Sequence, residues 1–348
     1  GNIYRLAEML GVGEDGIMDF SASINPLGVS SKVQREINKS LNDLVHYPDP
    51  EAKALRIELA RHHNLDPENI ICGNGSTELI YLIPRALKPQ KVLIPRPTFS
   101  EYERAILVSG QRSAVSGQLL KNEDHFEINT PEFIRAMKGC DMAFLCNPNN
   151  PTGKLLKKND VLRIASAAKK VKCHLIVDEA FIDFCPEESV INEVRNNPFL
   201  MVLRSMTKFY ALTGLRIGYG VFPADIASRL KEVKEPWTVN TLAQKSGIIA
   251  LNDKTYAKKT LALIKKNKKF LENGFEKAGI KFFRSAANFY LLRIENAVEI
   301  CQKLRQKGIF VRDCSNFIGL DESYIRVAVK SDRDNARLLK ELSRLCEG

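Results

Sequence analysis

The segment "FLMVLRSMTKFYALTGLRIGYG" (residues 199–220) decides the fold, because it places a lysine close to the end of a buried strand. Its first six residues form a short apolar run of the kind that buried strands have. Lys208 follows this run within a long apolar stretch. A lysine held against apolar walls has a lowered pKa and can form an imine with a carbonyl compound. Lys208 is therefore either a catalytic residue or one more surface lysine of a basic chain.

Other short β-rich runs end in polar residues in the same way, and helical patterns such as residues 157–170 separate them. These strand candidates are residues 91–95, 142–147 and 174–181. An alternation of strands and helices predicts an α/β fold with a mostly parallel, doubly wound sheet. In such sheets ligands bind beyond the carboxyl ends of the strands. The residues that follow the strands are therefore the candidate site.

The pattern changes in the last part of the chain. A long basic helix is followed by three predicted strands, "NFYLLRI", "GIFVRDC" and "YIRVAVK", and by a C-terminal helix. At the other end, a short helix (residues 3–10) precedes "IMDFSASINPLG", whose Asn, Pro and Gly residues predict a loop. We therefore expect a large domain over residues 30–250 and a smaller α+β domain made of residues 1–29 and 251–348.

The composition restricts the class of protein. The chain has 348 residues, of which 44% are apolar, and its 52 Lys and Arg against 41 Asp and Glu give a formal net charge of +11. Such a charge is compatible with nucleic acid, an anionic substrate or a solvated surface. The one basic run, "KKTLALIKKNKKF" (residues 258–270), carries apolar residues near helical spacing. This spacing favours a solvated helix face, so we expect no nucleic-acid partner.

The cysteines bear on the cellular compartment. Eight cysteines include no C-x-x-C pair, and several lie inside apolar runs such as "IIC" and "AFLC". They are typical of reduced core residues, so we expect a cytoplasmic protein without a structural metal. The chain has no apolar run of the roughly 18 residues that a membrane span needs, and it starts without a signal peptide's apolar core. We expect no membrane partner and, because the sequence begins at Gly1, residues upstream of it.

One strand end could bind an anion. The turn in "CGNGSTELI" (residues 72–80) follows a predicted strand and opens an apolar-periodic helix. The backbone N–H groups of Gly75, Ser76 and Thr77 would point at an anion, and the helix dipole would favour a phosphate there. An ordinary helix N-cap has the same sequence features, so the turn alone leaves both interpretations open.

Two further strand ends carry polar residues. Asp178 in "IVDEAF" ends an apolar strand, and it either pairs within the protein or faces the protonated nitrogen of a ligand. The loop "CNPNNPTGK" (residues 146–154) could present an asparagine amide, although such loops are more often purely structural turns. Ser205 and Arg216 flank the lysine with a hydroxyl and a guanidinium suited to a phosphate. An imine-forming lysine beside a phosphate site and a buried aspartate describes pyridoxal phosphate.

In combination, these segments resemble the fold type I pyridoxal-phosphate enzymes of the aminotransferase superfamily. The resemblance rests on "NPNNPTG", "DEAF" about thirty residues on, "SMTK", and an arginine eight residues after the lysine, and it extends over nearly the whole chain. It implies that Lys208 forms an imine with the cofactor and later moves protons. It also implies that Asp178 pairs with the pyridine nitrogen and that Asn150 donates to the phenolic oxygen.

The resemblance also assigns the cofactor's phosphate and ring. The phosphate ligands that it implies are Gly75, Ser76, Thr77, Ser205 and Arg216. Phe99 would stack on the ring, and Tyr47 in "HYPDP" would reach the phosphate of the partner subunit's cofactor. Because this family builds its site across a two-fold interface, a homodimer with a shared active site is implied.

One position departs from the pattern of the superfamily. Aminotransferases commonly have a tyrosine three residues after the aspartate, and its hydroxyl also contacts the cofactor's phenolic oxygen. Phe181 stands there in this chain. Because a hydrogen bond from that hydroxyl would favour the ionised oxygen, its loss is expected to keep the cofactor–lysine linkage protonated to higher pH.

Two branches of the superfamily act on phosphorylated amines, namely histidinol-phosphate aminotransferases and L-threonine-O-3-phosphate decarboxylases. The stretches "DFSASINPLG", "DEAFIDF", "MTKFYA", "PWTVN" and "GLDESYIRVAVKS", with the initial "GNI", are more similar to the decarboxylases of cobalamin biosynthesis. The expected reaction is decarboxylation of L-threonine O-3-phosphate to (R)-1-amino-2-propanol phosphate. The alternative is transamination of histidinol phosphate with 2-oxoglutarate and glutamate.

The same resemblance implies the substrate contacts. Arg326 in "YIRVAV" would bind the substrate's α-carboxylate, and Arg312 in "FVRDC" would contact its phosphate in both branches. Ser23 and Asn25 belong to the loop that contributes further contacts, and Ser23 stands where the decarboxylases have asparagine. A non-catalytic regulator with this fold is the alternative class, but the chain carries no fused helix-turn-helix module and retains Lys208.

Overall fold

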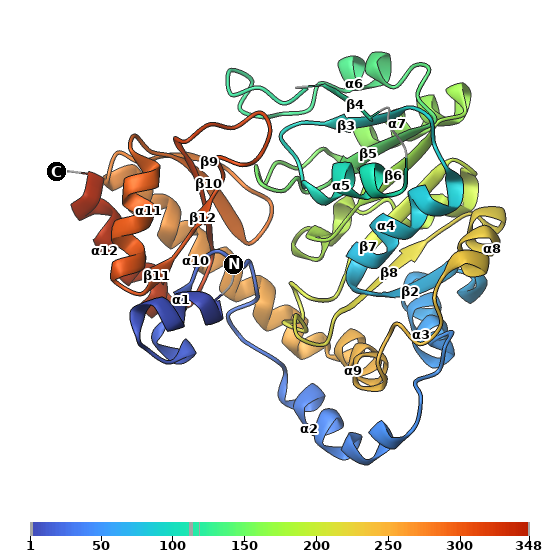
Figure 1. Cartoon of the computed structure of the whole chain (residues 1–348), viewed down its shortest axis with the longest axis horizontal. Helices are drawn as coiled ribbons and strands as arrows, with labels where there is room; N and C mark the ends of the chain where they lie inside the picture. The colour runs from blue at the N-terminus through green and yellow to red at the C-terminus, as the bar shows by residue number, and fades with distance from the viewer. Residues whose placement is uncertain (1–2, 111–113, 118, 347–348) are drawn as a thin grey trace.

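The computed structural model describes residues 3–110, 114–117 and 119–346 and consists of two lobes (Figure 1). Gly1 and Asn2, which begin the "GNI" stretch, lie outside the described residues. The large lobe is built on a seven-stranded sheet with strand order β2-β8-β7-β6-β5-β3-β4, and the small lobe on a four-stranded and a two-stranded sheet. Among the described residues, no helix is both long and apolar enough to cross a membrane.

The seven-stranded sheet confirms the predicted α/β architecture. Its strands are β2 (Ile70–Asn74), β3 (Val92–Pro95), β4 (Ala114–Gly117), β5 (Met142–Cys146), β6 (His174–Asp178), β7 (Leu200–Ser205) and β8 (Ile217–Val221). All the pairs from β4 to β7 are parallel, and only β8 runs antiparallel to its neighbours β7 and β2. The segment that joins β7 to β8, residues 206–216, is too short for a parallel crossover. The reversed strand therefore returns Arg216 to the sheet edge at which Lys208 lies.

Helices cover both faces of this sheet. They are α2 (Ser31–Lys39), α3 (Lys53–His63), α4 (Gly75–Leu87), α5 (Glu101–Val108), α6 (Thr130–Ala136), α7 (Lys158–Val171), α8 (Ala224–Val233) and α9 (Thr241–Asn252). Alternate residues of β6 enter two separate cores: Leu175 and Val177 pack with α3, α7 and α9, and Ile176 packs with α4, α5 and α8. This arrangement is a doubly wound sheet with a core on each face.

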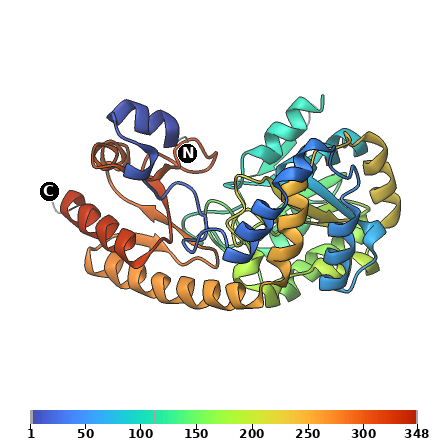
Figure 2. The same cartoon turned by 90° about the horizontal axis from the view of Figure 1, so that it is seen from below.

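The small lobe combines both ends of the chain. Its helices are α1 (Ile3–Leu10), α10 (Lys254–Lys277), α11 (Ala297–Gln306) and α12 (Asp332–Cys346), and its four-stranded sheet consists of β9 (Lys281–Phe283), β10 (Phe289–Arg293), β12 (Arg312–Asp313) and β13 (Tyr324–Ala328). Figure 2 shows α10, in orange, running along the small lobe towards the large one. The boundaries after residues 29 and 250 stay predictions.

Two sequence-based expectations for the small lobe were incomplete. The predicted loop after α1 contains a two-residue strand, β1 (Met18–Asp19), which pairs in parallel with β11 (Ile309–Phe310). The predicted strand "GIFVRDC" is divided into β11 and β12, because its two halves pair with different partners, β1 and β13. The pairing of β1 brings the next residues, Ser21 to Ser23, to the cavity described below.

Candidate active site

A cavity of about 460 Å³ lies where the two lobes meet, beyond the carboxyl ends of β5, β6 and β7. Most of the site residues predicted from the sequence line it: Ser23, Gly75, Ser76, Thr77, Phe99, Asn150, Asp178, Ser205, Lys208, Arg216, Arg312 and Arg326. The position agrees with the rule that ligands bind beyond the carboxyl ends of the strands in α/β sheets. Within the described ranges, no group of three or more His, Cys, Asp or Glu residues could hold a metal ion.

Lys208 lies on the loop between β7 and β8. Burial lowers the pKa of its amine to about 8, and the positive charges of Arg326 and Arg216 contribute to the shift. The backbone carbonyl of Lys208 accepts a hydrogen bond from the Asn25 N–H at 3.1 Å, which ties this loop to the small lobe. A larger fraction of this amine than of an ordinary lysine amine is therefore unprotonated near neutral pH, and the unprotonated amine is the form that attacks a carbonyl.

Asp178 ends β6 and is only 3% exposed. Its carboxylate accepts hydrogen bonds from the Tyr102 hydroxyl at 2.7 Å and from the Ala180 N–H at 3.0 Å. Burial raises the pKa of Asp178 to about 6, and the Glu179 charge adds to the increase, although both donors oppose it. The ion pairs formed among the described residues do not include Asp178. Its carboxylate is thus buried, oriented and able to accept a cation from a ligand.

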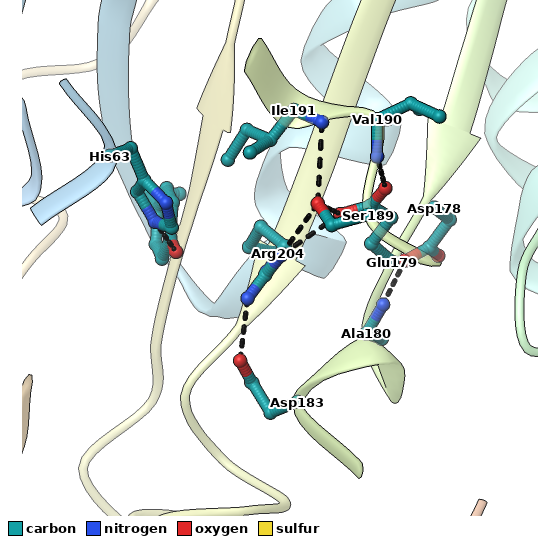
Figure 3. A network of polar contacts seen from close by, with 10 residues as sticks. His63, Asp178, Glu179, Ala180, Asp183, Ser189, Val190, Ile191 and Arg204 are labelled. Carbon is teal, nitrogen blue, oxygen red and sulfur yellow. Dashed lines mark hydrogen bonds and ion pairs between the residues drawn. The ribbon is translucent and has the colours of Figure 1, made fainter. Parts of the chain in front are cut away.

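Glu179 points to the opposite side of the strand, into a buried ionic network (Figure 3). Its carboxylate lies 2.9 Å from the Arg204 guanidinium and accepts hydrogen bonds from the Ser189 hydroxyl and the Val190 N–H, both at 2.7 Å. A second ion pair, of 2.5 Å, joins Arg204 to Asp183. Because strand residues alternate between faces, this network lies behind Asp178 and Ser205 and connects the ends of β6 and β7.

The start of α4 forms a cradle with Arg216. Gly75 has a φ of +73°, and a Cβ there would lie 2.6 Å from the Arg216 Nη2 atom. A Cβ at Gly218 would lie 2.3 Å from the Ser76 nitrogen, so the backbone of β8 also approaches the helix start closely. Ser205 adds its hydroxyl, which lies 2.7 Å from that of Thr207. Backbone N–H groups, two hydroxyls and a guanidinium together suit a phosphate.

The "NPNNPTG" loop is both a structural turn and a part of the cavity. Asn147 and Asn149 stabilise the turn. The Asn149 NH₂ group donates hydrogen bonds to the Pro97 carbonyl at 3.0 Å and to the Thr152 hydroxyl at 2.9 Å. The Asn147 NH₂ group donates to the Leu156 carbonyl. Asn150 instead lines the cavity, and its amide oxygen accepts a hydrogen bond from Arg326 Nη1. Its NH₂ group is therefore the part that could donate to a ligand.

Arg326 and Arg312 occupy facing positions of the antiparallel strands β13 and β12, and both line the cavity. Arg326 Nη2 donates to the Ser21 carbonyl at 2.9 Å, and its guanidinium lies 5.0 Å from the centre of the Phe289 ring. The Arg326 Nε and the Ser23 hydroxyl are buried without a hydrogen-bond partner among the described residues. This end of the cavity therefore offers two guanidinium groups and an unpaired hydroxyl to an anionic ligand.

Two of the predicted residues lie outside the cavity. The Asn25 NH₂ group is buried within hydrogen-bond distance of the Phe209 carbonyl, the Tyr256 hydroxyl and the Thr260 hydroxyl, so its side chain holds the loop instead of facing a substrate. Tyr47 is 83% exposed and lies 5.2 Å from the Trp237 ring, measured between ring centres. Its contact with a partner subunit's cofactor stays a prediction.

The phenylalanines of the motifs border the cavity. Phe181 is 5% exposed and packs edge-on against Phe289 at 5.0 Å, and Phe99 packs edge-on against Tyr102 at 5.6 Å. Sequence reasoning missed several further residues of the cavity wall, among them Tyr102, Thr207 and Phe317. Tyr102 lies three residues after Phe99, in the first turn of α5, and this closeness in sequence was the available signal.

A strand-end lysine, a buried aspartate and a phosphate cradle at a helix start define this protein as a fold type I pyridoxal-phosphate enzyme. A family model described as "Aminotransferase class I and II" matches residues 15–342, and the chain belongs to that family. Its cofactor is pyridoxal 5'-phosphate. The residues present fit this group, because the Gly75 cradle excludes a side chain and the buried Asp178 can accept a protonated ring nitrogen.

Individual relatives carry two activities. The chain is 38% identical to the threonine-phosphate decarboxylase of Salmonella typhimurium, over 100% of this chain and 96% of that protein. It is 33% identical to an adenosylcobalamin biosynthesis bifunctional protein of Leptospira interrogans, over 100% of this chain and 41% of that protein. The structure of the histidinol-phosphate aminotransferase from Clostridium acetobutylicum matches with a TM-score of 0.89 at 33% identity, over 95% and 99% of the two chains.

Proposed function

We propose that this enzyme decarboxylates L-threonine O-3-phosphate to (R)-1-amino-2-propanol phosphate in cobalamin biosynthesis. The observation that carries the proposal is the pair Arg312 and Arg326, which face each other on neighbouring strands and line one cavity. Threonine phosphate carries a phosphate and a carboxylate in one molecule, and each suits one guanidinium. The 38% identity to a threonine-phosphate decarboxylase, extending over the whole chain, supports the same choice.

The proposed roles of the cofactor contacts follow from the cavity. Lys208 would hold the cofactor covalently, Asp178 would pair with its ring nitrogen, and Asn150 would donate to its phenolic oxygen. Phe99 would stack on the ring. The phosphate would be held by Gly75, Ser76, Thr77, Ser205 and Arg216. When bound, the cofactor supplies an electron sink for the electron pair left at the substrate's Cα.

The chain's own residues would control the outcome at Cα. Arg326 and Arg312 would fix the substrate's two anionic groups, and so fix which bond at Cα is oriented for cleavage. The bond from Cα to the carboxylate breaks, CO₂ leaves, and the remaining electron pair takes up one proton. Lys208 is the proposed donor of that proton, since its pKa of about 8 allows the amine to take and release protons near neutral pH.

The proposal includes a homodimer. Large apolar side chains are exposed around Tyr47: the exposed fractions are 50% for Leu41, 55% for Leu44, 79% for Val45 and 50% for Trp237. An exposed apolar group of this kind is typical of an interface. Light scattering should give the mass of two chains, and a single-chain mass with full activity would contradict the shared site. The cytoplasmic location stays a prediction.

The holoenzyme's products test the proposed reaction. Threonine phosphate should yield CO₂ and aminopropanol phosphate in equal amounts without a keto acid. The second candidate, transamination of histidinol phosphate with 2-oxoglutarate, is favoured by the TM-score of 0.89 to a histidinol-phosphate aminotransferase. If histidinol phosphate and 2-oxoglutarate give glutamate while threonine phosphate gives no CO₂, transamination of histidinol phosphate replaces the proposed function.

A further inference from the structure

The guanidinium of Arg312 is held by two neighbours on the loop that follows β12. Its Nη2 donates to the Asn316 amide oxygen at 2.8 Å, and its central carbon lies 5.3 Å from the centre of the Phe317 ring. Phe317 is 5% exposed and lines the cavity together with Arg312. An aromatic face and a hydrogen-bond acceptor together restrict a long, flexible side chain to one region.

The loop that carries these two residues is itself fixed. The N–H of Phe317 donates to the Cys314 carbonyl at 3.0 Å, and the N–H of Leu320 donates to the Phe317 carbonyl at 2.9 Å. Gly319 has a φ of +96°, and a Cβ there would lie 3.2 Å from the Pro97 Cδ atom of the large lobe. The loop therefore packs against the large lobe at Gly319 and places Phe317 at the cavity wall.

This restraint acts against electrostatic repulsion. Arg312 and Arg326 are directly opposite each other on β12 and β13, and like charges in facing positions repel. Arg326 is fixed by Asn150, by the Ser21 carbonyl and by the Phe289 ring. Without its own contacts, Arg312 would be free to swing away from Arg326 into solvent.

We propose that Phe317 and Asn316 are positioning residues that keep the Arg312 guanidinium directed into the cavity for the phosphate of the substrate. The inference rests on the proposed function only in requiring a phosphorylated substrate, and it holds for either candidate reaction. Phe317 covers one face of the guanidinium and Asn316 occupies one of its N–H groups. The remaining N–H groups are left to bind the phosphate.

The test measures the dissociation constant of inorganic phosphate for the holoenzyme by titration calorimetry, with the KM and kcat for threonine phosphate beside it. Phe317→Leu removes the aromatic face and Phe317→Tyr retains it. Phe317→Leu is expected to weaken phosphate binding about fivefold and to raise KM similarly, with kcat changed less than about twofold. Phe317→Tyr should stay within about twofold of wild type.

The Asn316 variants separate positioning from a merely structural role. Asn316→Ala removes one hydrogen bond, and about a fivefold loss of phosphate affinity is expected. Asn316→Asp keeps an acceptor for Arg312 but adds a negative charge that competes with phosphate, so it should bind phosphate more weakly than Asn316→Ala while melting at the same or a higher temperature. A structural role alone predicts the opposite order, with the aspartate restoring wild-type behaviour.

A matched control lies outside the cavity, where the Arg305 guanidinium is 5.6 Å from the centre of the Phe310 ring. Phe310→Leu removes the same kind of contact and should leave phosphate binding unchanged. The inference is overturned if the wild type binds no phosphate, if Phe317→Leu binds it like the wild type, or if Asn316→Asp binds it at least as tightly as Asn316→Ala. If phosphate binding follows the expected order but no CO₂ is formed, only the proposed reaction fails.

Discussion

Asp178 should destabilise the cofactor-free protein, and replacing it with asparagine should reverse that effect. Burial raises the pKa of this carboxyl from 3.8 to about 6. A carboxyl whose pKa is raised on folding stabilises the protein fully when the pH is below its unfolded-state pKa. This stabilisation is lost as the pH rises through its folded-state pKa. The difference of about two pKa units, at 1.36 kcal/mol each, makes the ionised Asp178 cost about 3 kcal/mol above pH 6.

Asp178→Asn is the appropriate change because asparagine can keep both hydrogen bonds. Its amide oxygen can accept from the Ala180 N–H and its NH₂ group can donate to the Tyr102 oxygen. Urea unfolding of the cofactor-free proteins should therefore find the variant more stable, by up to about 3 kcal/mol, at pH 8. The difference should shrink steadily as the pH is lowered from 6 towards 4.

Binding of the cofactor should reverse this order of stability between the wild type and Asp178→Asn. In the holoenzyme the ionised Asp178 would have the protonated ring nitrogen as its proposed partner. The wild type should therefore gain more stability from the cofactor than the variant does, and the variant should lose activity about a hundredfold or more. Asp66→Asn is the control, because Asp66 is an exposed helix N-cap residue outside the cavity. This change should alter the free energy of unfolding by less than about 0.5 kcal/mol. A cofactor-free Asp178→Asn protein less stable than wild type at pH 8 would show that the ionised Asp178 does not destabilise the protein.

Three other changes test separate parts of the site. Lys208→Ala should lower activity by about 10²–10⁴-fold. Borohydride reduction followed by peptide mass spectrometry should find the cofactor on Lys208 of the wild type and on no peptide of the variant. A cofactor-labelled peptide in the variant would assign the linkage to another residue. If the cofactor binds as proposed, Phe181→Tyr would add a donor near the phenolic oxygen and should lower the pH midpoint of the cofactor's absorbance change by about one unit, whereas identical titrations would exclude the contact. Arg204→Met leaves the buried Glu179 and the half-buried Asp183 without their cation and should lower the free energy of unfolding by about 3–5 kcal/mol. Glu179→Gln should restore part of this loss, and a melting temperature equal to wild type would contradict this role.

Five of the strands of the large sheet, β2, β3, β5, β6 and β7, were predictable because each is a short, largely buried run. β5 and β6 fall inside the expected ranges, since a strand covered by helices on both faces is apolar at nearly every position. β8, "IGYGV", was not expected as a strand, because its two glycines lower strand propensity. The structure explains Gly218: a side chain there would collide with the backbone at the start of α4.

The site was predictable only where a motif carries it. The lysine, aspartate and asparagine follow strands and belong to recognisable segments, and all three line the cavity. Tyr102 and Arg204 lie close in sequence to Phe99 and Ser205, but the contacts that they make, like those of Phe317, depend on packing between distant elements. Asn25 was expected at the substrate, but its amide has three partners within the protein. Its sequence neighbourhood is the same whichever way the side chain points.

The proposed decarboxylation is tested most directly by a competition between the two candidate substrates in one mixture. The holoenzyme would be supplied with equal concentrations of threonine phosphate, histidinol phosphate and 2-oxoglutarate, and the phosphorylated products would be followed by phosphorus NMR. The ratio of products then gives the ratio of the two kcat/KM values. Aminopropanol phosphate is expected as the main product, with CO₂ in equal amount. Consumption of histidinol phosphate with threonine phosphate left intact would contradict the proposed decarboxylation.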